Sequence, residues 1–477
     1  MIKILTLNPP FIKNFSRSSR SPAVTKGGTI YFPIYLSYAT GNLEKHGFET
    51  KLVDAVANGW SHEQTLQFVR QFKPDLALID TSTPSIYNDV SIAFKIKETG
   101  VQHVSLVGTH PTRLDKETLE LDKNIDSVCR GEYDETVVEL AKTLEAGKSP
   151  AEVKGLTFRQ GQKIIKNPDR PLIKDLDALP FVSEVYKRHL DIKKYFYASL
   201  LWPQVTLLTA RGCPYNCSFC NIPFKASYRF RSPENVVSEL EYIESELPYV
   251  REVMIEDDTF PVIKERTEKI CRLLVERKIR VKWSCNARVN TDLETLKLMK
   301  KANCRLLCVG FETPRQNILD SIHKNTTKEL QVDFMKNTRR AGLLVNGCFI
   351  LGLPGDTKDS IRETIEFAKE LNPDTAQFYP LMVYPGTEAY EWAKRSGSLL
   401  YEDYSKWITK EGLHSTAVSR PELSSEELVM LCDQMRSEYY LRGGYIFSKM
   451  VQSITNPREL ERTLKALKTF SRHLFRR

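Results

Sequence analysis

The stretch Ala210-Arg-Gly-Cys213-Pro-Tyr-Asn-Cys217-Ser-Phe-Cys220 decides how this chain is to be interpreted. Its three cysteines have the spacing CxxxCxxC and follow a β-type run at 204–209 that leads into Gly212. Thiolates supplied from a tight loop are the ligands of iron–sulfur clusters. No histidine or fourth cysteine lies nearby to complete a tetrahedral zinc site, so zinc is the weaker alternative. We therefore expect Cys213, Cys217 and Cys220 to bind a [4Fe–4S] cluster and to leave one of its irons open to a further ligand.

The composition is that of an ordinary folded protein. The chain has 477 residues, of which 41% are hydrophobic and 27% charged, and at ~150 residues per domain it should form about three domains. The formal charge of +9 is too small and too spread along the chain to predict a nucleic-acid partner. No run approaches the ~18 apolar residues of a transmembrane helix, and the apolar run at the start of the sequence is too short for a secretory signal. We expect a cytoplasmic protein in which the other seven of the ten cysteines are packing residues.

The first third of the chain alternates between short β-type runs and helical patterns. The β-type runs are 2–7, 49–53, 76–80, 103–107 and 127–129. This alternation predicts an α/β domain over 1–150, built on a doubly wound, five-stranded parallel sheet. Ligands of such sheets bind beyond the carboxyl ends of the strands. The loops there are rich in hydroxyl groups and glycine, and their candidate ligand-binding residues are Thr81, Ser82, Thr83, Ser85, Gly108, Thr109, His110, Gly131 and Glu132. No GxGxxG motif follows the first run, which argues against a dinucleotide.

The rest of the chain continues in three segments. Residues 151–199 form a connector with a β-hairpin at 155–167, and a barrel-like alternation of strands and helices follows over 200–400. A helical region covers 401–477. Charged or polar residues follow successive strands of the second segment, where barrel enzymes place their active sites. These residues are Glu256, Asp257, Asp258, Arg288, Glu312 and Tyr384.

The cysteine motif and these strand-end residues resemble the radical S-adenosylmethionine (SAM) superfamily. The resemblance implies a partial (β/α)₆ barrel of the TIM type over 200–400 and a SAM molecule chelated to the open iron of the cluster. Glu256, Asp257 and Asp258 stand where the superfamily contacts the SAM amino group, although the usual GGE motif is replaced here by three acids. Arg288 resembles the basic residue that meets the SAM carboxylate, and Glu312 resembles the ribose or methionine contact.

An α/β domain before such a barrel resembles the cobalamin-binding subgroup, the class B radical SAM methyltransferases. The loops ending in Ser85, Thr112 and Glu132 match the places where that subgroup holds the corrin ring and its nucleotide tail. The DxHxxG motif that supplies a histidine to cobalt is absent, so His110 is expected to contact the tail or to pack within its loop.

The resemblance implies methylation of an unactivated carbon in a small-molecule or lipid substrate. It implies that a 5′-deoxyadenosyl radical and methylcobalamin carry the reaction, and that a flavodoxin or ferredoxin supplies electrons. Glu312 and Tyr384 are the candidates for residues that contact the reacting substrate. Two alternatives stay open: a cyclisation or rearrangement without net methyl transfer, and a non-catalytic cobalamin or redox-sensing module.

The last expected helix, 457–475, carries leucines at helical spacing and a basic excess. Two interpretations fit this pattern. The helix either packs on the barrel with a solvated basic face, or makes a peripheral contact with an anionic membrane.

Overall fold

The computed structural model describes the chain except for residues 1, 19, 223, 226, 456–459 and 465–477. It divides into two compact units that interleave along the sequence. The first unit comprises Met1–Val24, Ile30–Tyr195 and Glu402–Gly412, and the second comprises Thr25–Thr29, Phe196–Tyr401 and Leu413–Arg477. Most of the segment expected as a connector therefore belongs to the first unit, and the chain returns to that unit at 402–412.

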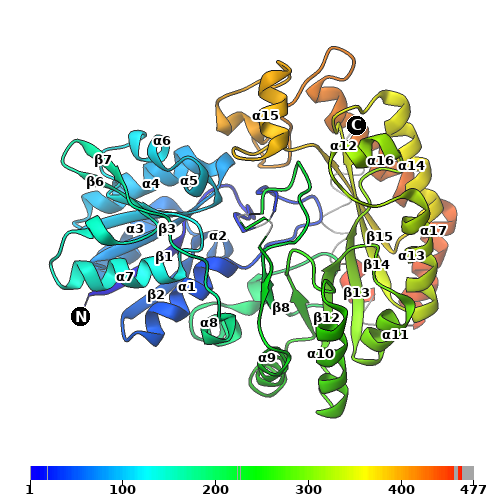
Figure 1. Ribbon diagram of the computed structural model, residues 1–477, viewed down its shortest axis with the longest axis horizontal. Coiled ribbons are helices and arrows are strands. Elements are labelled where there is room, and N and C mark those ends of the chain that lie inside the picture. The colour runs from blue at the N-terminus through cyan, green and yellow to red at the C-terminus, as the bar shows by residue number, and fades with distance from the viewer. Residues whose placement is uncertain (1, 19, 223, 226, 456–459, 465–477) are drawn as a thin grey trace. The chain divides into compact units, whose positions relative to one another are not determined.

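A seven-stranded sheet forms the centre of the first unit, in the order β2-β1-β3-β4-β5-β6-β7 (Figure 1). Its first five strands are parallel, as predicted: β1 (Lys3–Asn8), β2 (Glu49–Asp54), β3 (Leu76–Thr81), β4 (His103–Gly108) and β5 (Ser127–Cys129). The expected hairpin consists of β6 (Leu156–Gln160) and β7 (Lys163–Lys166). Because β6 pairs antiparallel with β5, the hairpin widens the sheet.

Helices cover both faces of this sheet. They are α1 (Ile34–Lys45), α2 (Ala55–Asn58), α3 (His62–Phe72), α4 (Ile86–Glu98), α5 (Thr109–Arg113), α6 (Asp115–Glu120), α7 (Asp134–Glu145) and α8 (Val182–His189). Successive residues of a strand point to opposite faces, so Ile4 and Leu5 of β1 enter two different apolar clusters. The first cluster includes residues of α1 and α7, and the second includes residues of α3 and α4. Burial on both faces explains why the strands are almost continuously apolar.

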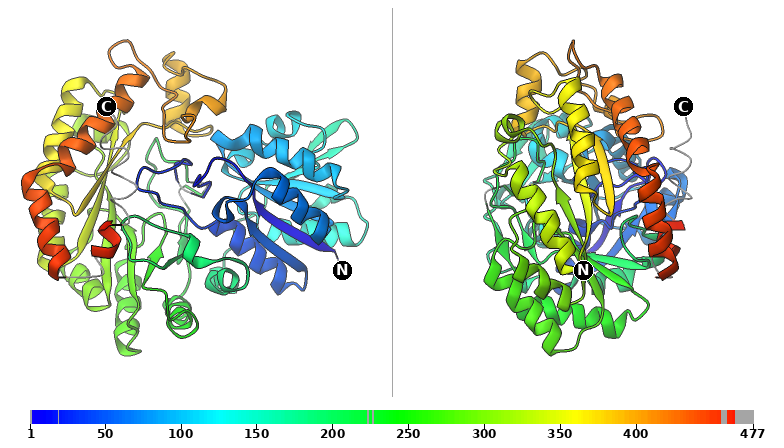
Figure 2. Two further views of the ribbon diagram at one scale, coloured as in Figure 1. Left: turned by 180° about the vertical axis from the view of Figure 1, so that it is seen from behind. Right: turned by 90° about the vertical axis from the view of Figure 1, so that its right-hand side faces the viewer.

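The second unit contains six parallel strands in the order β15-β14-β13-β12-β11-β8. They are β8 (Gln204–Leu207), β11 (Glu252–Ile255), β12 (Lys282–Ala287), β13 (Cys304–Gly310), β14 (Leu344–Leu351) and β15 (Thr375–Pro380). The connecting helices are α9 (Pro233–Glu246), α10 (Lys264–Glu276), α11 (Leu293–Lys301), α12 (Gln316–Ser321), α13 (Lys328–Ala341) and α14 (Lys358–Leu371). Strands that neighbour one another in sequence order, with helices on the outer side (Figure 2), confirm the predicted partial barrel.

Helices follow the last barrel strand, as expected. They are α15 (Glu388–Arg395), α16 (Ser425–Tyr440) and α17 (Gly443–Thr455). Most of the helix predicted at 457–475 lies outside the described residues, and the described part, 460–464, is helical. In the part of the chain that the structure describes, no helix has the length and apolar character needed to cross a membrane.

Candidate active site

The three cysteines lie in a loop closed by a short antiparallel pair, β9 (Ala210–Arg211) and β10 (Arg229–Phe230). Cys213 and Cys217 are buried, and the Cys220 N–H donates to the Cys217 carbonyl at 3.2 Å, which makes a turn between these two residues. The Ser218 N–H donates to the Ile322 carbonyl at 3.1 Å and so ties the loop to the chain beyond β13. All ten cysteines lie in the described residues and none forms a disulfide.

Among the described residues, no group of three His, Cys, Asp or Glu side chains is placed to hold one metal ion. A [4Fe–4S] cluster instead takes its thiolates on different irons. Three thiols on one short loop fit that requirement. The assignment of Cys213, Cys217 and Cys220 to the cluster stays a prediction.

Gly212 sets the course of the backbone into the cysteine loop. Its φ is +85°, and a Cβ there would lie 1.6 Å from the Ser227 carbonyl oxygen. Since the obstacle is backbone, Gly212→Ala should prevent the loop from closing and reduce iron incorporation to background. Gly397→Ala is the matched control, because Gly397 also has a positive φ but has open space around it. The control should cost about 1–2 kcal/mol of stability and keep its iron. Normal iron content in Gly212→Ala would contradict this account of the loop.

Asp257, at the end of β11, anchors the base of the loop. Its Oδ1 accepts the N–H groups of Thr209 and Ala210 at 2.6 and 3.0 Å, and its Oδ2 accepts the Thr209 hydroxyl at 2.5 Å. Burial raises the pKa of Asp257 to about 6, even though the charge of Arg266 opposes the shift. In this structure the carboxylate therefore positions the chain that leads to Cys213, and its predicted contact with SAM stays a prediction.

Asp258 follows in the same loop. Burial, with the charges of Asp258 and Cys217 adding to it, raises the pKa of Cys213. Glu256 precedes the anchor and donates its N–H to the Leu207 carbonyl at 2.9 Å. The predicted roles of Glu256 and Asp258 toward the SAM amino group stay predictions.

Arg288, just beyond β12, lies against the cysteine loop. Its guanidinium lies 3.8 Å from the centroid of the Tyr215 ring and donates to Cys217 Sγ at 3.7 Å. It also donates to the Lys324 carbonyl. Hydrogen bonds to the sulfurs of a cluster tune its reduction potential. The sequence singled out Arg288 for the SAM carboxylate, whereas the contacts with Cys217 and Tyr215 were not foreseen.

Glu312 follows β13 and has a buried carboxylate, of which only one oxygen has a hydrogen-bond partner in the described part of the chain. Its Oε1 accepts the Lys324 ammonium at 2.6 Å, while its buried Oε2 has no hydrogen-bond partner among the described residues. The backbone is held at φ +66°, which is uncommon for a residue with a side chain. Gly310 makes room for the ion pair, because a Cβ there would lie 2.3 Å from Glu312 Oε1. A buried acceptor with one open position fits a hydroxyl donor, such as the SAM ribose.

Removing the Glu312 charge should weaken SAM binding. Glu312→Gln leaves the Lys324 ammonium without its carboxylate and weakens the acceptor, so we expect roughly a ten- to hundredfold loss of SAM affinity. Equilibrium dialysis of the reconstituted protein measures this loss. Glu363→Gln is the control, since Glu363 is an exposed carboxylate paired with Arg315. Equal SAM affinity in Glu312→Gln and the control would contradict the role of Glu312.

Tyr384 is buried in the chain that follows β15. Its carbonyl accepts the Thr387 hydroxyl at 2.7 Å, at the start of α15. The candidate catalytic role of Tyr384 stays a prediction.

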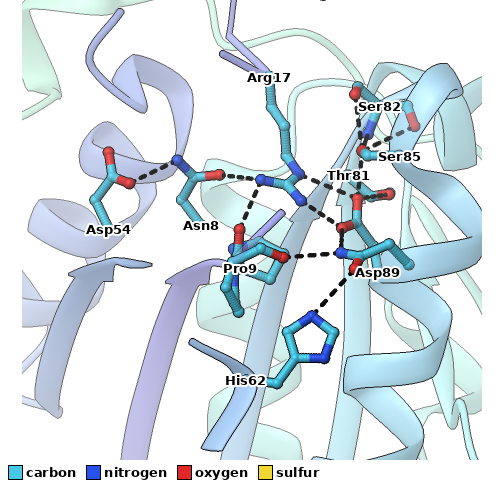
Figure 3. Close-up of polar contacts among 11 residues, drawn as sticks. Asn8, Pro9, Arg17, Asp54, His62, Thr81, Ser82, Ser85 and Asp89 are labelled. Atoms are coloured by element: carbon cyan, nitrogen blue, oxygen red, sulfur yellow. Dashed lines mark hydrogen bonds and ion pairs between the residues drawn. The ribbon is translucent and has the colours of Figure 1, made fainter. Parts of the chain in front are cut away.

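A second polar site lies at the carboxyl ends of β1, β2 and β3 in the first unit (Figure 3). The order 2-1-3 of these strands places a topological switch point between β1 and β3. Arg17, from the long loop after β1, is buried there and pairs with Asp89 of α4 at 2.5 and 3.1 Å. It also donates to Asn8 Oδ1 at 2.9 Å and to the Pro9 carbonyl at 2.7 Å. Arg17 thus joins the end of β1 to α4.

Three residues predicted to bind a cofactor turn their hydroxyls into this network. The Thr81 and Ser85 hydroxyls donate to Asp89 Oδ2 at 2.6 and 2.5 Å, and Ser82 and Ser85 share a hydrogen bond at 2.9 Å (Figure 3). The loop after β3 is therefore held by its own side chains. Its predicted contact with a cofactor stays a prediction.

Asp54 extends the network to the end of β2. Its Oδ1 accepts Asn8 Nδ2 at 2.9 Å, and its Oδ2 accepts the Tyr195 hydroxyl at 2.8 Å. Arg17, Asn8 and Asp54 were not predicted as site residues. No pattern in the sequence after β1 indicated that Arg17 would be buried.

His110, in the loop after β4, is buried. Its Nδ1 shares a hydrogen bond with Thr83 Oγ1 at 3.2 Å, and its ring meets the edge of Tyr404 at a centroid distance of 5.0 Å. Burial lowers the pKa of His110 to about 4, so the ring is neutral at pH 7. His110 therefore packs against Thr83 of the loop after β3 and against Tyr404, and its predicted contact with the nucleotide tail stays a prediction.

Gly108, Gly131 and Glu132, in the neighbouring loops, differ in their surroundings. Gly108 has φ +117°, and a Cβ there would lie 2.2 Å from the Thr81 carbonyl oxygen, so β3 and β4 approach closely at this point. Thr109 begins α5 directly after it. Gly131, at φ +66°, has open space around it, which lets a ligand approach the backbone. Glu132 accepts the Ile173 N–H at 2.8 Å.

Asp80, at the end of β3, should make stability depend on pH. Burial raises its pKa to about 7, against the opposing charge of Arg17. The folded state binds the Asp80 proton more tightly than the unfolded state does. This proton therefore stabilises the fold fully below about pH 4, and the stabilisation is lost as pH rises through about 7. Asp80→Asn should therefore gain stability relative to the unmodified chain between pH 5 and 8, by at most about 1.4 kcal/mol per pH unit. Urea unfolding of both chains at pH 5 and at pH 8 measures this gain. The same difference in unfolding free energy between the two chains at both pH values would contradict the prediction.

Two family models match the chain, one in each unit. The model of the B12 binding domain matches residues 20–141, and the model of the radical SAM superfamily matches residues 207–368. The first range begins after Arg17 and contains Asp54, Thr81, Ser85 and Asp89 of the network around it. The second range contains the cysteine loop, Arg288 and Glu312.

Relatives match over nearly the full chain. A protein of Pyrococcus horikoshii, described as the uncharacterized methyltransferase PH0819, is 30% identical over 448 residues, which cover 93% of both chains. The anaerobic magnesium-protoporphyrin IX monomethyl ester cyclase of Cereibacter sphaeroides is 30% identical over 388 residues, which cover 79% of this chain and 62% of the cyclase. The fold is similar to that of the radical SAM methyltransferase TsrM from Kitasatospora setae, solved with cobalamin and a [4Fe–4S] cluster, with a TM-score of 0.70, 17% identity and coverage of 92% and 88%.

Proposed function

Because this chain belongs to the radical SAM superfamily, in the group with a B12-binding domain, we propose that it is a cobalamin-dependent methyltransferase. We propose further that its substrate is an unactivated carbon of a small molecule or lipid. When bound, the cluster with SAM supplies a 5′-deoxyadenosyl radical, and cobalamin supplies the methyl group. One observation carries the proposal: a connected set of contacts runs from Cys217 through Arg288 and Lys324 to Glu312.

The chain's own residues supply position and charge. Asp257 fixes the start of the cysteine loop, and Arg288 places an N–H donor against Cys217. Glu312 offers its second carboxylate oxygen to a hydroxyl of the bound ligand, while Lys324 neutralises the buried charge. A carboxylate held in this way orients a ligand without moving when it binds.

Methyl transfer is supported by the relative described as a methyltransferase, whose match covers 93% of both chains. The cyclisation alternative keeps the same cofactors. The products of the reaction therefore decide between methyl transfer and cyclisation.

The products of SAM separate the proposed function from its alternatives. The full chain, reconstituted with iron, sulfide and hydroxocobalamin, should convert SAM into both S-adenosylhomocysteine and 5′-deoxyadenosine under a strong reductant. Leaving out hydroxocobalamin should abolish S-adenosylhomocysteine and spare 5′-deoxyadenosine. 5′-Deoxyadenosine alone, with cobalamin present, would support cyclisation or rearrangement. Neither product from a chain with its full cluster would support a non-catalytic module.

We infer that a flavodoxin or ferredoxin supplies the electrons and that the protein works in the reducing cytoplasm. A cluster with an iron open to ligand requires a reducing environment to persist, which supports this location.

A further inference from the structure

Lys225 brings a positive charge to the cysteine loop. Its ammonium donates to the Cys217 carbonyl at 2.9 Å. Its backbone pairs with the backbone of Cys213 in an isolated parallel bridge. Lys225 is therefore held against two of the three cysteines, by its side chain at Cys217 and by its main chain at Cys213. It follows Cys220 in the sequence and was not predicted as a site residue.

No acid neutralises the charge of Lys225. Among the residues that the structure describes, no carboxylate forms an ion pair with its ammonium. Arg288 adds a second cation at the same cysteine, since its guanidinium donates to Cys217 Sγ at 3.7 Å. The charge of Asp258 acts in the opposite direction at Cys213, whose pKa is raised by burial and by this charge. Positive charge is therefore concentrated at Cys217.

Positive charge at Cys217 acts on the electron that a cluster must accept. A [4Fe–4S] cluster held by three thiolates carries net negative charge, and reduction adds to it, so a nearby cation stabilises the reduced form more than the oxidised form. The carbonyl that Lys225 contacts and the sulfur belong to one residue, so the ammonium lies within a few ångströms of that sulfur. Because Lys225 is half-buried, solvent screens this attraction only in part.

We propose that Lys225 raises the reduction potential of the cluster, so that the electron donor reduces it more readily. The inference rests on the proposed function in requiring that the three cysteines hold a [4Fe–4S] cluster, and it applies equally to methyl transfer and to cyclisation. One electron passes from the flavodoxin or ferredoxin, which is oxidised, to the cluster, which is reduced. Lys225 keeps its proton throughout and acts as a positioning residue through its charge.

A redox titration of the reconstituted full chain, followed by electron paramagnetic resonance of the reduced cluster, tests the proposal. In Lys225→Gln, the ratio of reduced to oxidised cluster at a fixed potential should fall roughly tenfold. For a one-electron couple, that fall is a midpoint potential about 59 mV more negative. Lys225→Arg keeps the charge and should titrate like the unmodified chain. Lys297→Gln is the control and should keep the midpoint potential, because Lys297 is an exposed residue of α11 that pairs with Glu294.

The iron content of each variant separates an effect of charge from a loss of the loop. An unchanged or less negative midpoint potential in Lys225→Gln with full iron would overturn the proposal. Loss of iron from Lys225→Gln would also overturn it, since Lys225 would then serve to hold the loop. Equal shifts in Lys225→Gln and Lys225→Arg would show that the charge is not the cause. An unmodified chain without a cluster would contradict the proposed function as well, whereas a normal titration of that chain with no shift in Lys225→Gln would contradict this inference alone.

Discussion

Replacing Cys217 by serine will abolish the reductive cleavage of SAM. The thiolate is the ligand that a cluster iron prefers, and Cys217 is also the sulfur that Arg288 contacts. With only two thiols left on the loop, the reconstituted protein should lose its cluster absorbance and form no 5′-deoxyadenosine above background. Anaerobic spectroscopy and chromatography of the products measure the two effects.

Cys432→Ser is the control for this variant. Cys432 is a buried thiol of α16 in the same unit. A change there tests whether losing a packed sulfur is enough to abolish the activity. Full cleavage of SAM by Cys217→Ser, with an intact cluster, would remove Cys217 from the proposed site.

Replacing Arg17 by methionine should strongly destabilise the first unit. Methionine leaves Asp89, whose side chain is fully buried, without its cation, and breaking a buried pair in this way costs about 3–5 kcal/mol. Adding Asp89→Asn should recover part of the loss, because an amide carries no charge to desolvate. Urea unfolding followed by circular dichroism measures both variants.

The same network should hold the loops that we propose to bind cobalamin. Arg17→Met should therefore retain less hydroxocobalamin after gel filtration, under conditions in which the chain is still folded. Arg70→Met breaks the exposed pair with Glu63 and should change stability by at most about 1 kcal/mol, with normal cobalamin retention. If Arg17→Met were as stable as this control, the buried network would not be what fixes the loops.

The strands and the cysteine loop could be predicted because their signals are local. Runs of β-branched and apolar residues separated by helical patterns identify parallel strands, and the expected β5, 127–129, agrees with the structure at both ends. The three cysteines are close together in the sequence and lie in one loop. The glycine before Cys213 occupies a position where a side chain would meet backbone.

The partners of the buried charges could not be predicted, since they come from distant parts of the chain. Arg17 and Asp89 are 72 residues apart and meet only when β1 and β3 pair. Lys324 reaches Glu312 across the chain that contains α12. Asp257 follows a strand, and the sequence does not show that its carboxylate accepts hydrogen bonds from Thr209 and Ala210. Tertiary packing alone brings these groups together.

The metal content of the anaerobically reconstituted full chain tests the central claim most directly. Because the structure provides three thiols on one loop for a cluster and a separate unit that matches a B12 binding domain, iron, acid-labile sulfide and cobalt should all be retained after gel filtration. Iron and sulfide should disappear in Cys217→Ser while cobalt remains, and cobalt should fall in Arg17→Met while iron remains. A chain that holds zinc in place of iron, or that holds iron but never cobalt, would contradict the account.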